Sequence, residues 1–135
     1  MKQNKFKCIE FDDDYNRINI LIGDKGFVNY KDIEKVSLLN EDAKFRGKTQ
    51  PFVHQVLGGT TFYTIFGEPS FYVGLKIVLK DHTIKAAYIS DRTTRFNTDI
   101  YKEDVKEGNL IKRKIEKRIS QIISPVVNIL QKIKE

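Results

Sequence analysis

The chain has 135 residues, of which 40% are hydrophobic and 31% charged, with a formal net charge of +6. This length fits one domain, which buries about two thirds of its unfolded surface and needs no disulfide or metal to fold. The single Cys8 cannot form an intramolecular disulfide, Met1–Phe11 lacks the apolar core of a signal peptide, and no stretch approaches the ~20 apolar residues of a membrane span. We therefore expect a soluble, cytoplasmic protein and exclude disulfide scaffolds and transmembrane proteins.

The first forty residues alternate apolar and polar side chains in short runs that turn residues separate. Asp12–Asn16 and Gly23–Gly26 are typical of tight turns, and Lys31–Ile33 is expected to turn a corner. Alternation of this kind predicts half-buried strands. The expected strands are Lys5–Phe11, Arg17–Ile22, Phe27–Tyr30 and Glu34–Leu39. Their order predicts an antiparallel meander.

The middle of the chain divides into a polar loop, an ambiguous segment and a hairpin. Asn40–Pro51 is polar and predicts a loop. Phe52–Gly67 favours a hairpin about Gly58-Gly59, with a short helix over Val53–Leu57 as the alternative. Phe71–Lys80 is the clearest strand of the chain, and Thr83–Ile89 is expected to return beside it after a turn at Asp81-His82.

After a polar loop at Ser90–Thr98, the spacing of the apolar residues changes to steps of four and three, which is typical of an amphipathic helix. The stripe consists of Ile111, Ile115, Ile119, Ile122, Val126, Leu130 and Ile133. We expect a helix over about 109–134 that Asn109 caps and Pro125 kinks or restarts. Asp99–Gly108 predicts either a short helix or an irregular approach.

Two segments resemble bacterial pleckstrin-homology-like domains. Tyr30–Leu38 resembles their strand–corner–strand signature, and Phe71–Ile89 resembles their later hairpin, although Asp81-His82 lacks the usual glycine. Leu57–Gly67 loosely resembles an apolar insert found in some members. The resemblance implies a single α+β domain over residues 1–135: a small, strongly bent antiparallel sheet or barrel, with strands over about 5–89, capped by the C-terminal amphipathic helix. The family has no common catalytic site, so no functional residue is carried over.

The sequence offers little for catalysis, metals or cofactors. Asp12, Asp14 and Asn16 have the first spacings of a calcium loop, but Arg17 and Gly23 stand where the glycine and the closing carboxylate belong, so a capped turn is the better interpretation. Cysteine and histidine have no zinc spacing, and Cys8 lies within an apolar strand. Glu41-Asp42 and Glu103-Asp104 are carboxylate pairs that we expect to be solvated. We therefore predict a protein that is not an enzyme and binds neither metal nor cofactor.

A basic cluster at the start of the expected helix is the main candidate for binding. It comprises Lys112, Arg113, Lys114, Lys117 and Arg118. Cations in the first turns of a helix oppose its dipole, at a cost of a few tenths of a kcal/mol each. This conflict favours a role in binding an anionic partner through Lys112, Arg113 and Lys117. The alternative is a solvated face on which Glu116 offsets part of the charge.

The segment after Pro125 is more apolar than a frayed tail requires, through Val126, Leu130 and Ile133 among others. It packs on the body of the domain, on a second copy of the chain or on a partner, since exposed apolar patches mark interfaces. Taken together, the sequence favours a non-catalytic protein–protein interaction module, with homo-oligomerisation through the C-terminal helix as one use of this segment. The alternative is an anion-binding module that contacts phospholipid headgroups or nucleic acid through its basic face.

Overall fold

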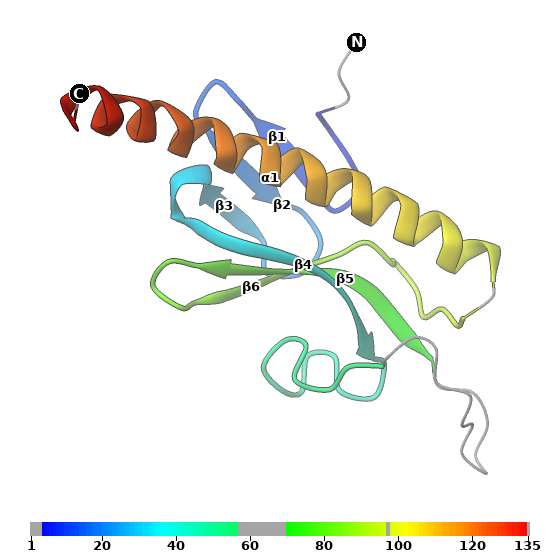
Figure 1. The fold of residues 1–135 in the computed structure, drawn as a ribbon. Coiled ribbons are helices and arrows are strands. Elements are labelled where there is room, and N and C mark those ends of the chain that lie inside the picture. Colours follow the sequence, from blue (N-terminus) through cyan, green and yellow to red (C-terminus); the bar gives the residue numbers. More distant parts are fainter. Residues whose placement is uncertain (1–3, 57–69, 97, 135) are drawn as a thin grey trace.

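The structure is a computed structural model that describes residues 4–56, 70–96 and 98–134, with side chains of the last helix described as far as Ile122. These residues form two three-stranded antiparallel sheets, a short 3-10 helix and a long C-terminal helix (Figure 1). The predicted α+β class is confirmed. None of the helices in the described ranges is long and apolar enough to cross a bilayer.

The first sheet contains the first three strands of the predicted meander, whereas the fourth, predicted over Glu34–Leu39, belongs to the second sheet. Its strands are β1 (Ile9–Asp12), β2 (Arg17–Ile20) and β3 (Gly26–Asn29), in the order β1-β2-β3. The register places apolar residues opposite one another on one face. That buried face carries Ile9, Phe11, Ile18, Ile20 and Val28. Alternation in sequence thus becomes one buried and one outward face, as the two-residue period of a strand requires.

The second sheet follows a corner at η1 (Tyr30–Asp32). It contains β4 (Ile33–Asp42), β5 (Phe71–Leu79) and β6 (Ile84–Tyr88) in the order β4-β5-β6. The middle strand is the most apolar, and its Val73, Leu75 and Ile77 are fully buried. The predicted turn at Asp81-His82 is present, with His82 at a φ of 73° and its N–H donating to the carbonyl of Leu79.

The described strands do not close into a barrel, so the barrel form of the expected fold is not found. Instead, the chain just after β2 pairs with β6 and joins the two sheets. Gly23 bridges Ala87, the Asp24 N–H donates to the Ala86 carbonyl at 2.8 Å, and the Tyr88 N–H donates to the Ile22 carbonyl at 3.0 Å. The Ala86 N–H also donates to the Asp24 carboxylate at 2.8 Å. One strand extension therefore holds the two sheets together.

The helix α1 (Asp99–Lys134) is longer than predicted and lies across the molecule as one continuous element (Figure 1). It begins at Asp99 rather than near Asn109, because the Thr98 hydroxyl accepts a hydrogen bond from the Tyr101 N–H and so caps the first turn. Gly108, which marked a helix boundary in the sequence, lies inside the helix. A Cβ there would lie 2.5 Å from the Leu38 side chain, so the glycine permits close approach to β4.

Pro125 does not divide the helix, so the predicted second helix is not formed. In the middle segment, Val53–Val56 is not helical, and the hairpin predicted about Gly58-Gly59 lies outside the described residues. The predicted apolar stripe is confirmed as far as side chains are described. Ile111 and Ile115 are fully buried, and Ile119 and Ile122 pack partly buried against the same core.

The burial of Ile115 leads to a stability prediction. Replacing it by alanine leaves a cavity between α1 and the sheets, so we expect Ile115→Ala to lower the free energy of unfolding by about 2–5 kcal/mol. The matched control is Leu110→Ala on the same helix, where the side chain is 37% exposed. Urea unfolding followed by circular dichroism measures both. Equal losses in the two variants would contradict the packing described here.

The junction of the sheets leads to a second prediction. Gly23 and Gly26 both have a positive φ, of 119° and 136°, but only at Gly23 would a Cβ overlap the Ala86 carbonyl; at Gly26 it would meet nothing. Both alanine variants lose the conformational freedom of glycine, so their difference isolates the steric contact. We expect Gly23→Ala to be less stable than Gly26→Ala by about 1–3 kcal/mol in the same unfolding measurement. Similar stabilities would show that this contact does not hold the sheets together.

Candidate anion-binding groove

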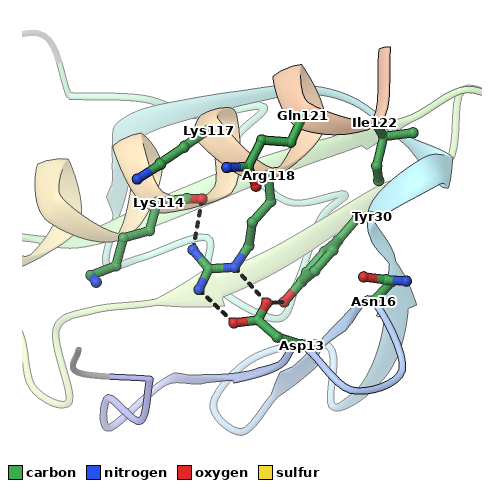
Figure 2. A pocket seen from close by; sticks show the side chains of 8 residues that line it. All are labelled: Asp13, Asn16, Tyr30, Lys114, Lys117, Arg118, Gln121 and Ile122. Atoms are coloured by element: carbon green, nitrogen blue, oxygen red, sulfur yellow. Dashed lines mark hydrogen bonds and ion pairs between the residues drawn. The ribbon is translucent and has the colours of Figure 1, made fainter. Parts of the chain in front are cut away.

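A groove of about 460 Å³ runs between α1 and the turn that links β1 to β2. Figure 2 shows it from close by, with basic side chains descending from the helix, Asp13 on the turn below them, and Tyr30 reaching toward Asp13 from η1. The lining residues are Asp13, Asn16, Tyr30, Lys114, Lys117, Arg118, Gln121 and Ile122. Three cations and one carboxylate leave this groove with two net positive charges.

Arg118 is fixed at the centre of the groove. Its Nε and Nη2 donate to the two carboxylate oxygens of Asp13 at 2.7 and 2.8 Å, and its Nη1 donates to the Lys114 carbonyl at 3.0 Å (Figure 2). The guanidinium carbon lies 4.2 Å from the centroid of the Phe11 ring, and the side chain is only 13% exposed. A planar guanidinium fork suits this paired geometry, which a lysine cannot reproduce.

Tyr30 completes the arrangement from η1. Its hydroxyl donates to Asp13 Oδ1 at 2.7 Å. Burial raises the pKa of Tyr30 above its usual value, and the hydrogen bond to Asp13 and the charge of Asp13 add to this effect. The hydrogen bond to Asp13 in turn raises the pKa of Arg118. Asp13 is therefore held between a protonated phenol and a permanent cation.

Lys114 and Lys117 form the basic wall of the groove. Figure 2 shows both side chains extending from α1 to the same side of Arg118. Neither makes an ion pair with any residue that the structure describes, whereas Arg118 pairs with Asp13. Among the described residues, no nearby carboxylate therefore offsets the charges of the two lysines in the way that Asp13 offsets the charge of Arg118.

Of the three predicted basic residues, the structure brings one into the groove. Lys117 lines it, Arg113 is exposed outside it, and Lys112 forms an i,i+4 pair with Glu116 at 3.7 Å. The reason given for choosing them was wrong, because α1 begins at Asp99 and these cations lie in its interior, where the dipole has little effect. The predicted apolar binding residues Val126, Leu130 and Ile133 lie outside the described side chains.

Asp13 and Tyr30 were missed as site residues. Asp13 was interpreted only as part of a turn, and it lies 105 positions from Arg118, so no local spacing reveals the pair. Tyr30 belongs to the corner motif, but nothing in that motif indicates where its hydroxyl points. The run of acidic residues at Asp12–Asp14 beside a basic helix was the one available signal.

The other residues that the sequence offered for metal binding or catalysis have structural roles. Asp12 pairs with Arg17 at 2.9 Å, and no cluster of three metal-ligating side chains occurs within the described residues. Cys8 is buried, and burial is the main cause that raises its pKa to about 12. The thiol is therefore protonated and sequestered from solvent.

A second polar cluster lies on the face of the second sheet remote from α1, beneath the loop after β4. Glu41, which we expected to be solvated, is 1% exposed and accepts hydrogen bonds from the Tyr88 hydroxyl at 2.6 Å and the Phe52 N–H at 2.5 Å. The Arg46 guanidinium covers the rings of Tyr72 and Tyr88 at 4.3 and 4.0 Å. These contacts anchor the loop to the sheet, and the two hydrogen bonds supply the buried Glu41 carboxyl group with partners.

Comparison with known proteins adds no relative: no family model matches the chain, and no curated protein or solved structure is significantly similar.

The fixed position of Arg118 leads to a third prediction. Arg118→Lys keeps the charge but loses the paired donors and the stacking on Phe11, so we expect it to lower the free energy of unfolding by about 1–3 kcal/mol. Arg113→Lys is the control on an exposed site and should change stability by less than about 0.5 kcal/mol. Urea unfolding of both proteins at equal salt measures the difference. An Arg118→Lys variant with unchanged free energy of unfolding would show that charge alone holds the turn to the helix.

Proposed function

We propose that this chain is a non-catalytic interaction module that binds a polyanionic partner along the groove between α1 and the β1–β2 turn. The observation that carries this proposal is the pair of lysines, Lys114 and Lys117, which line the groove without an ion-pair partner among the described residues.

The electrostatics of the groove favour an anion over a neutral or cationic ligand. Asp13 is the one carboxylate of the lining, and it is already paired with Arg118 and hydrogen-bonded to Tyr30. An incoming phosphate or carboxylate therefore meets two lysine ammonium groups with little competition. Such charge-assisted hydrogen bonds are stronger than neutral ones. The fixed Arg118 adds to the positive potential of the groove, and its side chain does not have to be ordered when the ligand binds.

Binding is the role that fits these groups. Tyr30 is kept protonated by its raised pKa, and Asp13 accepts three hydrogen bonds from Tyr30 and Arg118, so neither is poised to take a proton from a substrate. A protein partner, which the sequence favoured, fits the same groove through an acidic or phosphorylated segment. Phospholipid headgroups and nucleic acid fit it through their phosphates.

We also propose that the chain is a divergent pleckstrin-homology-like domain. The meander that leads through a corner into a second antiparallel sheet, followed by a C-terminal helix packed across the strands, supports this proposal. The open arrangement of the two sheets is the point at which the described residues depart from the closed barrel that the family implies.

The function is tested by the salt dependence of binding to immobilised heparin, a polyanion without bases. Neutralising both groove lysines in Lys114→Gln/Lys117→Gln should remove about two charge contacts and so reduce the slope of log K against log salt by about two. The matched control Lys102→Gln/Lys106→Gln removes the same charge from two exposed positions of α1 outside the groove. Equal changes in the two double variants would assign the binding to net charge, and no retention of the wild type at low salt would refute the proposed function.

A further inference from the structure

A second hollow adjoins the groove and extends it around the β1–β2 turn. It measures about 370 Å³ and is lined by Tyr15, Asn16, Asn29, Lys31 and Ile122. Asn16 and Ile122 line both hollows, so the two adjoin at these residues. Lys31 adds a third cation that makes no ion pair within the described ranges.

Exposed aromatic rings lie at the far end of this path. Tyr15 is 70% exposed in the turn, and Phe27 is 58% exposed on the outward face of β3. Both rings flank Arg17, whose guanidinium carbon lies 4.8 Å from the Tyr15 centroid and 3.8 Å from the Phe27 centroid. Arg17 is itself held by Asp12. Tyr15 and Phe27 thus form an aromatic platform around Arg17 that leaves much of both rings open to solvent.

Packing of the core does not explain why this platform consists of aromatic residues. The core is already filled by the inward residues of the same strands, such as Ile18 and Val28, and neither exposed ring belongs to it. Arg17 covers one side of each ring, so a planar group can stack on the remaining surface. Rings presented in this way beside a cationic groove are the combination by which proteins hold unpaired bases and their phosphates together.

We propose that the polyanion is a single-stranded nucleic acid, with its phosphates along Lys114, Lys117 and Lys31 and its bases on Tyr15 and Phe27. This inference rests on the proposed function of the groove and goes beyond it by naming the ligand. A duplex keeps its bases stacked inside and cannot use the platform. An acidic protein segment or an anionic membrane would use the lysines but would gain nothing specific from a stacking surface.

The test uses fluorescence anisotropy with a labelled oligothymidylate of about 12 nucleotides, a length within the usual range of single-strand sites. The variant Tyr15→Leu/Phe27→Leu keeps apolar bulk but removes the ring faces, and we expect it to weaken oligonucleotide binding roughly tenfold or more. Its elution from heparin should stay that of the wild type. The control Val53→Leu/Leu110→Met changes two exposed apolar side chains outside the groove and should bind as the wild type does.

Each other outcome decides against a stated part of the account. Wild-type binding to heparin but not to the oligonucleotide overturns the nucleic-acid assignment and leaves the proposed function standing. Unchanged oligonucleotide binding in Tyr15→Leu/Phe27→Leu overturns the platform, as does equal affinity for a duplex of the same length. Binding to phosphatidylserine vesicles without binding to the oligonucleotide assigns the groove to membranes instead. Failure of the wild type to bind heparin refutes both proposals, because both require an anion-binding groove. Circular dichroism and thermal unfolding of every variant show that the fold is retained.

Discussion

The ion pair between Arg118 and Asp13 is the interaction on which the candidate site depends. It joins the middle of α1 to the turn between β1 and β2, and its arginine also holds the carbonyl of Lys114. Tyr30, whose hydroxyl bonds to the same carboxylate, ties the turn to η1 and not to the helix. The pair therefore has a positioning role: it sets the distance between the lysine wall and the polar turn, and it removes the one carboxylate that would otherwise neutralise the lysines.

The pair in turn relies on the apolar contact between helix and sheets. Ile111 and Ile115 are fully buried against the strands, and Gly108 lets the helix approach β4 closely. A helix packed this firmly also fixes the residues that flank its buried stripe, so the groove residues need little ordering when a ligand arrives. The second face of the molecule is organised differently, because the Tyr88 hydroxyl donates to the buried Glu41 there and the Arg46 guanidinium lies over the Tyr88 ring, which anchors a loop.

The fold was largely predictable, and the site was not. Alternation at Arg17–Ile20 and Phe71–Leu79 and the isoleucine stripe at Ile111 and Ile115 predicted strands, helix and core, because period and burial are local properties of a sequence. The start of α1 was missed because Gly108 and Asn109 look like a helix boundary when Leu38, which packs on the glycine, is unknown. The pairing of Arg118 with Asp13 and the burial of Glu41 are consequences of tertiary packing, and no local spacing encodes them.

The most direct test of the account is to map the ligand contact surface residue by residue. Amide chemical shifts of the ¹⁵N-labelled protein should change on adding heparin or oligonucleotide at Asn16, Tyr30 and the helix from Lys114 to Gln121. The loop around Arg46 on the opposite face of the second sheet should remain unchanged. Shifts confined to the Arg46 loop, or spread evenly over all lysines and arginines of the chain, would contradict the claim that this groove is the binding site.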